Sequence, residues 1–237
     1  MSAANRSAVA ALTVAVVFTL FAGAPGAATA TQSGSGAGSG VCSGVTRCHV
    51  RAHADVNGDG RVDSVGVASR GHGANREVIV RVRTAPDQIS TARQKAPNWL
   101  GSLWHGVARL DGRRGVEIVV GETEGLHAHL YRAMTWRHGD LTTLRAPGHD
   151  RYWYTDGAYS IGAGWQVRAG TAPGTIRRRV AIRVSPTRAR PFRGHVNTFH
   201  WDSGDWVRVS TKKVPEMRQR RAYSWGGFYV PGLPRWS

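Results

Sequence analysis

Residues Asp55–Asp63, with the sequence DVNGDGRVD, contain the side chains whose types and spacing are most typical of a chemical site. Acidic and amide side chains recur at every second position, so a loop can turn several of their oxygens inward around one point. Gly60 allows the positive φ angle that the sharp turn of such a loop needs. The pattern predicts a site for a hard cation, calcium above all; the alternative is an ordinary polar β-turn. The predicted ligands are Asp55, Asn57, Asp59, the main-chain carbonyl of Arg61, and Asp63.

A second group of candidate residues lies in the segment GETEGLHAHL, which places two carboxylates and two imidazoles close together in the sequence. Zinc sites use three or four such ligands, and a hydrolytic zinc site keeps one position open for water. The carboxylates could instead be the acid pair of a glycosidase, although such pairs usually come from separate elements. The alternative is that all four are ordinary polar residues of a strand edge. The four residues are Glu122, Glu124, His127 and His129.

Other catalytic motifs are missing from the sequence. There is no G-x-x-x-x-G-K-[ST] loop for a nucleotide phosphate, and no G-x-S-x-G elbow in the part that is expected to fold. No catalytic residue is therefore assigned, and an enzyme is the less favoured interpretation. The alternative function that stays open is an extracellular hydrolase of a polysaccharide or an anionic polymer.

Aromatic side chains gather in RYWYTDGAYSIGAGWQ and again at the C-terminus. Aromatic platforms with nearby carboxylates hold sugar rings in many β domains, whereas alternating aromatic residues also pack cores. Both interpretations stay open for the first run, which contains Tyr152, Trp153, Tyr154, Tyr159 and Trp165. The C-terminal run SWGGFYVPGLPRW is expected to pack a last strand against the first.

The chain is strongly basic. It contains 32 Lys and Arg against 15 Asp and Glu, a formal net charge of +17. Such a surface attracts polyanions, and an anionic cell-wall polymer or polysaccharide is a better fit than nucleic acid because no nucleic-acid motif is present. The alternative is that the arginines reflect only the composition that a GC-rich genome favours.

The first 30 residues are typical of a signal peptide. Arg6 precedes an apolar run, Ala8–Ala22, that is too short to span a membrane, and Ala28-Thr29-Ala30 matches a cleavage site. A Gly/Ser-rich linker (31–41) and one domain (42–237) are expected to follow. The sequence therefore predicts a secreted, extracellular protein. In an oxidising compartment Cys42 and Cys48 are expected to form a disulfide.

The hydrophobic periodicity predicts an all-β fold. In EVIVRVR, the residues Val78, Val80 and Val82 alternate with Ile79, Arg81 and Arg83, as in an antiparallel sheet with one buried face. The same alternation in TIRRRVAIRV predicts a buried face formed by Ile176, Val180, Ile182 and Val184, opposite a solvated face of arginines. The one helical candidate is Ile89–Leu100, which Pro97 limits.

Two internal matches indicate repeats. The segment Ala54–Val67 aligns without gaps on Ala108–Gly121, but Arg109 and Arg113 stand where the first copy has Asp55 and Asp59. The second copy is therefore expected to bind no metal, and its arginines to pair with Asp111 or Glu117. Thr135–Leu144 likewise aligns with His200–Val209, and each segment is expected to form a hairpin with a glycine turn after a tryptophan.

The loop Asp55–Asp63, followed by a short apolar strand, resembles the FG-GAP or VCBS-type repeat of integrin-α-like β-propellers. Together with the signal peptide and the TWRHG hairpin, it resembles a group of secreted actinobacterial proteins that carry such repeats. This resemblance implies calcium at the five predicted ligands, in a role that stabilises a loop between strands. The expected fold is all-β, with repeat-built antiparallel sheets in a small or incomplete propeller-like arrangement; a β-barrel or a sandwich is the alternative. The expected function is a secreted, calcium-binding β-repeat protein with a non-enzymatic binding or structural role, at the cell envelope or on anionic polymers.

Overall fold

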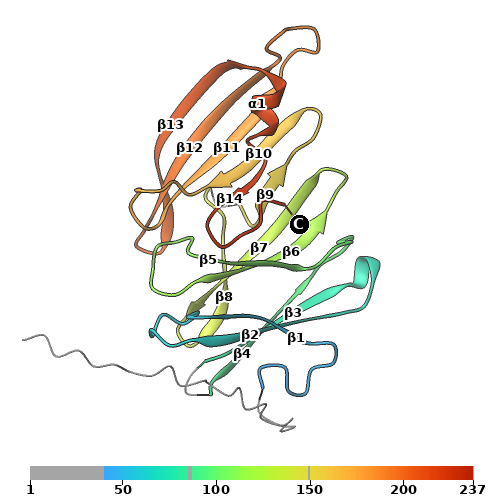
Figure 1. Cartoon of the computed structure of the whole chain (residues 1–237), viewed down its shortest axis with the longest axis vertical. Helices are drawn as coiled ribbons and strands as arrows, with labels where there is room; N and C mark the ends of the chain where they lie inside the picture. The colour runs from blue at the N-terminus through green and yellow to red at the C-terminus, as the bar shows by residue number, and fades with distance from the viewer. Residues whose placement is uncertain (1–39, 85–86, 149, 237) are drawn as a thin grey trace, which may run out of the picture. The chain divides into compact units, whose positions relative to one another are not determined.

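Strands make up nearly all of the regular structure in the computed structural model, which describes residues 40–84, 87–148 and 150–236 (Figure 1). The predicted signal peptide and residues 31–39 of the predicted linker lie outside the described residues. No helix of the described part has the length and apolar character needed to cross a membrane. The smaller sheet is a four-stranded antiparallel meander of β1 (His49–Ala54), β2 (Asp63–Arg70), β3 (Glu77–Arg83) and β4 (Ile89–Lys95).

The larger sheet has the strand order β13-β12-β11-β10-β9-β7-β6-β5, with β8 paired to β7 and β14 to β10. The regular structure is almost entirely β-strand, so the all-β prediction is confirmed. Both sheets are open at their ends in the described residues, so the alternative of a β-barrel is wrong. The strands are β5 (Trp104–Ala108), β6 (Glu117–Glu124), β7 (Ala128–Arg137), β8 (Asp140–Leu144), β9 (Trp153–Asp156), β10 (Ile161–Gln166), β11 (Thr175–Arg183), β12 (Phe192–Asp202), β13 (Asp205–Met217) and β14 (Gly227–Tyr229). A 3₁₀ turn (Gly73–Asn75) and helix α1 (Gln219–Tyr223) complete the elements.

The described strands form three units of the same topology. In each unit, four consecutive strands pair antiparallel with their neighbours: β1 to β4, β5 to β8, and β10 to β13. The first two units contain the aligned segments Ala54–Val67 and Ala108–Gly121 at the same place, as a loop between the first and second strands. The third unit has a loop at this place too, residues 167–174, which no sequence match revealed.

One large apolar core joins strands of all three units. Its members include Val78, Val80 and Val82 of β3, which are fully buried as predicted, and Trp153 and Trp165, whose rings lie 4.8 Å apart. Burial of this apolar area is the main stabilising term of the fold. The aromatic run therefore contributes its two tryptophans to the core, which favours the packing interpretation over a sugar platform for these two residues.

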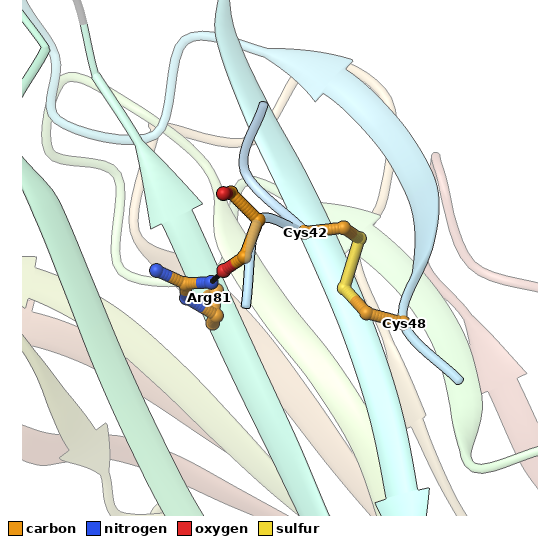
Figure 2. Close-up of a disulfide and its surroundings, with 4 residues drawn as sticks. Cys42, Cys48 and Arg81 are labelled. Atoms are coloured by element: carbon orange, nitrogen blue, oxygen red, sulfur yellow. Dashed lines mark hydrogen bonds between the residues drawn. A yellow bond between two sulfur atoms is a disulfide. The ribbon is translucent and has the colours of Figure 1, made fainter. Parts of the chain in front are cut away.

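The predicted disulfide between Cys42 and Cys48 is present (Figure 2). Its two sulfurs cover Gly66 of β2, where a Cβ atom would lie 3.0 Å from both. The same segment is held by Arg81, which donates a hydrogen bond of 2.6 Å to the carbonyl of Ser43. Val41, which the sequence analysis assigned to the linker, is buried beside the disulfide, so the ordered packing begins ahead of Cys42.

The two predicted hairpins are confirmed. In the hairpin of β7 and β8, Trp136 pairs with Leu141, one position before the pair that flanks the turn. In the hairpin of β12 and β13, Trp201 pairs with Trp206 at the same place. Each turn has two central residues with positive φ, His138-Gly139 in one and Ser203-Gly204 in the other. This is the turn geometry that matches the twist of antiparallel strands.

Three expectations about individual segments are wrong. The helical candidate forms strand β4 over Ile89–Lys95, because its alternate residues Ser90, Ala92 and Gln94 face inward while Thr91 and Arg93 are exposed. The last strand, β14, pairs in parallel with β10 and not with the first strand. The predicted buried face of β11 is buried at Ile176 but open at Ile182 and Val184, because the C-terminal segment covers the opposite face.

Close backbone packing brings the three loops together. A Cβ atom at Gly58 would lie 2.8 Å from the carbonyl oxygen of Arg114, and one at Gly112 would lie 2.2 Å from the amide nitrogen of Gly174. The N–H of Val116 donates to the carbonyl of Asp55 at 2.9 Å. Each loop thus touches the backbone of the next, which only glycine allows at these points.

We expect Gly112→Ala to destabilise the protein far more than Gly170→Ala. Both glycines have positive φ, +74° and +75°, so both substitutions carry a conformational cost of about 1–2 kcal/mol. A methyl group at position 112 would also collide with the backbone of Gly174, whereas position 170 has no atom within 4 Å of an added Cβ. The collision adds about 1–3 kcal/mol. Urea unfolding of the two variants measures the difference, and equal losses would contradict this packing.

Candidate functional site

The three loops line a cavity of about 570 Å³. Asp55 and Asp59 of the first loop lie on one wall. The second loop contributes Arg109, Arg113 and Arg114, whose side chains are exposed, and residues 171–174 of the third loop complete the lining. Among the described residues, none forms an ion pair with these three guanidinium groups. The cavity is therefore lined by two carboxylates and three guanidinium groups that form no ion pairs with each other.

The predicted cation loop is ordered by hydrogen bonds from its own backbone. The carboxylate of Asp55 accepts the N–H groups of Gly58 and Gly60 at 2.7 and 3.0 Å. The side-chain oxygen of Asn57 accepts the N–H of Asp59, and Asp59 accepts that of Arg61 at 2.7 Å. The bond from Arg61, followed by that from Asn57, lowers the pKa of Asp59 below its ordinary value of 3.8. Asp59 is thus firmly anionic at neutral pH.

Asp63 has a structural role that needs no metal. Its carboxylate is 1% exposed and accepts the N–H groups of Val56 and Asn57 at 2.8 and 3.1 Å. In the second unit Glu117 occupies the aligned position and accepts the N–H of Leu110 at 2.7 Å. The two carboxylates therefore close the equivalent loops of the two units in the same way, although only the first loop has the spacing of a cation site.

The side chains of the first loop were tested for their fit to calcium, which takes six to eight oxygen ligands. No group of three or more Asp, Glu, His or Cys side chains converges on a metal position within the residues described. The oxygens of Asp55, Asn57 and Asp59 each accept one N–H and have a second lone pair. The three predicted carboxylate ligands, Asp55, Asp59 and Asp63, are therefore not gathered around one point in this structure. Their carboxylate oxygens, with the amide oxygen of Asn57 and main-chain oxygens, are nevertheless the donor types that a hard cation takes.

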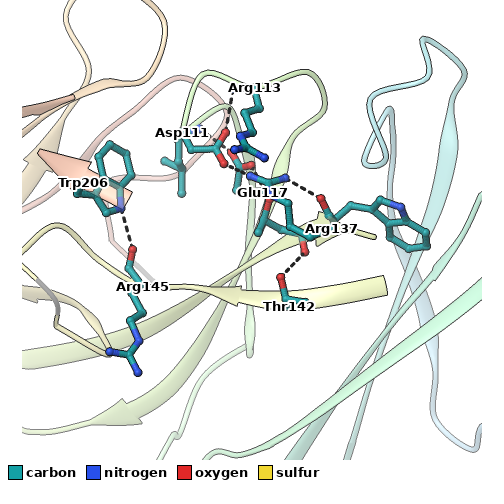
Figure 3. A network of polar contacts seen from close by, with 10 residues as sticks. Asp111, Arg113, Glu117, Arg137, Thr142, Arg145 and Trp206 are labelled. Atoms are coloured by element: carbon teal, nitrogen blue, oxygen red, sulfur yellow. Dashed lines mark hydrogen bonds and ion pairs between the residues drawn. The ribbon is translucent and has the colours of Figure 1, made fainter. Parts of the chain in front are cut away.

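The second loop contains an ion pair that the sequence analysis did not identify (Figure 3). Asp111, which is buried, pairs with Arg137 of β7, and Arg113 contributes only its backbone N–H, at 2.9 Å from Asp111. The expectation that the side chain of Arg109 or Arg113 would make this pair is therefore wrong. Position 137 lies on a neighbouring strand, so the spacing within the loop gave no sign of it.

Glu117 is the buried ionisable group at the centre of this network. It accepts hydrogen bonds from Leu110 and from the hydroxyl of Thr135, the latter at 3.1 Å. Burial, followed by the nearby carboxylate of Asp111, raises the pKa of Glu117 from 4.5 to about 7. The carboxyl group is therefore largely protonated below neutral pH in the folded protein.

A second basic cavity adjoins the first. It has a volume of about 370 Å³ and lies between the hairpins β7–β8 and β12–β13. Its lining includes Arg137, His138, Arg145 and Trp201. Arg113 lines both cavities, so the two are adjacent at this residue. Sequence analysis could not group these residues, because they come from separate hairpins that meet only in the fold.

The predicted zinc residues do not form one site. Glu122 is held by Arg132 through two hydrogen bonds of 2.7 Å, whereas Glu124 lies 3.3 Å from His129. His127 is exposed beyond the end of β6. The structure therefore pairs these carboxylates with separate partners and does not gather the four groups around a common centre.

The comparisons with known proteins gave no relative: no protein-family model, curated protein or solved structure matches the chain. The function is therefore inferred from the arrangement of the side chains alone.

We expect Glu117→Gln to change how stability depends on pH. The folded-state pKa of Glu117, about 7, exceeds the ordinary value of 4.5. The contribution of this group to the free energy of unfolding is therefore fully present below pH 4.5 and is lost as the pH rises to 7. This loss is on the order of 2–3 kcal/mol and is absent in the glutamine variant. Stability of the variant relative to wild type should therefore increase between pH 5 and pH 7.5 in urea titrations. His105, whose pKa burial lowers to about 4, affects both proteins equally. A constant difference would contradict the assignment.

Proposed function

We propose that this protein is a secreted, non-enzymatic binding protein for anionic polymers, and that the loop Asp55–Asp63 binds calcium as a local stabiliser. The observation that supports binding most directly is the basic region formed by the arginines that line two adjacent cavities, which share Arg113. Anionic cell-wall polymers and acidic polysaccharides are the expected partners, because they carry carboxylate, phosphate or sulfate groups at regular intervals.

The charges of this region are available to a ligand. The side chains of Arg109, Arg113 and Arg114 are exposed, while the acidic groups beneath them, Asp111 and Glu117, are buried. Asp111 is already paired with Arg137. Guanidinium groups bind carboxylate and phosphate through two parallel hydrogen bonds, so a loop with three of them favours a polymer with repeated anionic groups.

Calcium in the first loop would be held by Asp55, Asn57, Asp59, the carbonyl of Arg61 and Asp63. It would supply positive charge against Asp55 and Asp59, the acidic residues that line the cavity opposite the arginines. The second loop keeps the same carboxylate closure through Glu117 without these ligands. Calcium is therefore proposed to stabilise this one loop, and the fold is not proposed to require it.

The alternative, a hydrolase, has no specific observation in its favour. Glu122 is bound to Arg132 and Glu124 lies against His129, so neither pair presents two free acids across a cleft.

We expect replacement of Arg109, Arg113 and Arg114 by Gln to weaken binding to an anionic polymer by about 10- to 100-fold. Three exposed ionic contacts at about 0.5–1 kcal/mol each give this range. The measurement is retention on immobilised heparin and on isolated wall polymer over a salt gradient, since screening weakens such contacts. The matched control replaces Arg51, Arg220 and Arg221, which are exposed and outside both cavities. Equal losses in the two triple variants would mean that net charge alone drives the binding.

We expect calcium to raise the melting temperature, and Asp59→Ala to abolish the effect. With a dissociation constant of ~10⁻⁴ to 10⁻³ M, millimolar calcium adds roughly 0.4–1.4 kcal/mol of folding stability. For a chain of this size that corresponds to about 1–5 °C. Calorimetry with calcium and with EGTA measures the shift, and Asp202→Ala, an exposed aspartate outside the loop, is the control. An identical melt with and without calcium in the wild type would overturn the calcium assignment.

A further inference from the structure

Strand β11 places its arginines and its aliphatic residues on unexpected sides. Arg179 and Arg183 lie on the covered face, with their guanidinium carbons 4.2 Å from the ring centre of Tyr229 and 4.1 Å from that of Tyr159. On the opposite face Ile182 is 49% exposed, and Val184, just after the strand, is 48% exposed. Exposed branched aliphatic side chains at successive positions on one face indicate a surface that binds something apolar.

The arrangement follows from what covers each face. Ala181 and Phe192 pack with Ala222 and Trp225 of the C-terminal segment on the arginine side of the sheet. On the other side Ile176 is packed into the main core, and Arg178 pairs with Asp150 at 2.7 Å. Beyond Arg178, this face borders an open groove of about 720 Å³ formed by β11, β12 and β13.

The groove brings apolar and basic groups together, and Val214 and Pro215 of β13 line it beside the basic residues of that strand. Val180, Ile182 and Val184 form an apolar row along β11. In the next strands, His195 lies opposite Val180 and Arg193 opposite Ile182, and Lys213 lies opposite His195. Arg208 of β13 also lines the groove, and Glu216 is its one acidic lining residue. Burial, with a smaller contribution from Arg178, lowers the pKa of His195, so the permanent positive charges are those of Arg and Lys.

The dimensions define the size of a ligand. A row of alternate residues from position 180 to position 184 is roughly 13 Å long, and strands are spaced by roughly 4.8 Å. The basic groups of β13 therefore lie roughly 10 Å from the apolar row. A volume of about 720 Å³ is within the range of small-molecule sites.

We propose that the groove binds a single-chain anionic amphiphile as a monomer, with its alkyl chain along Val180, Ile182 and Val184 and its acidic head group between Arg193 and Lys213, which the strand register places two positions apart on adjacent strands. Charge complementarity supports the acidic head, and the exposed aliphatic row supports the chain. A purely polar polyanion would leave the row exposed to water, and a neutral chain would leave the basic groups unused. The groove shares no lining residue with the two loop cavities, so this site is independent of the polymer and calcium proposals.

The test is a titration of the full chain, labelled at isoleucine methyl groups, with n-decyl phosphate below its critical micelle concentration. We expect saturable binding with shifts of the Ile182 methyl resonance. n-Decyl maltoside has the same chain with a neutral head, and inorganic phosphate has the head without the chain. Both are expected to bind at least tenfold more weakly than decyl phosphate.

Two pairs of variants locate the site. Ile182→Thr should weaken binding of decyl phosphate about five- to tenfold, whereas Ile89→Thr, at a position 42% exposed on β4, should not change it. Arg193→Gln combined with Lys213→Gln should weaken it about tenfold, whereas Arg220→Gln combined with Arg221→Gln should have little effect. The proposal is overturned if decyl maltoside binds equally well, if phosphate alone binds as tightly, if only anionic vesicles bind, or if Ile89→Thr matches Ile182→Thr.

Discussion

Direct backbone contact between three strand-connecting loops is the constraint on which the rest of the structure depends. Gly58 lies against Arg114, Gly112 against Gly174, and the N–H of Val116 bonds to the carbonyl of Asp55. These contacts hold the equivalent loops of the three units against one another, and the apolar core joins strands of all three units. The same contacts bring Asp55 and Asp59 opposite the arginines of the second loop. The candidate site is thus a direct result of the packing that joins the units.

A buried carboxylate closes two of these loops. Asp63 and Glu117 each begin the second strand of a unit and accept an N–H from a residue seven positions earlier, Val56 or Leu110. The charge at these positions is tolerated because main-chain N–H groups solvate it in place of water. In the second unit burial nevertheless raises the pKa of Glu117 to about 7. The loop frame therefore depends on a hydrogen-bond acceptor at this position more than on a negative charge.

Local patterns predicted the elements well. Alternation identified β3, glycine turns after Trp136 and Trp201 identified both hairpins, and Cys42 with Cys48 formed the expected disulfide. These features depend on residues that are close in sequence. The third unit was missed because its loop, residues 167–174, joins the first and second strands as in the other two units but contains no acidic side chain. The ion pair of Asp111 with Arg137 was missed because it joins a loop to another strand.

The error on β11 shows why composition alone overestimates the charge that a partner can reach. Alternation correctly separated the arginines from the aliphatic residues, but which face is buried depends on the segment that covers it. Here Tyr159, Tyr229 and Phe192 lie against Arg179 and Arg183 at cation–π distances. Arg132 and Arg137 are likewise bound to carboxylates. The arginines behind the net charge of +17 therefore include some that hold the fold and others that remain open at the loop cavities and the groove. The open arginines at the cavities and the groove are the ones on which the proposed binding depends, because a ligand can reach them without breaking an internal contact.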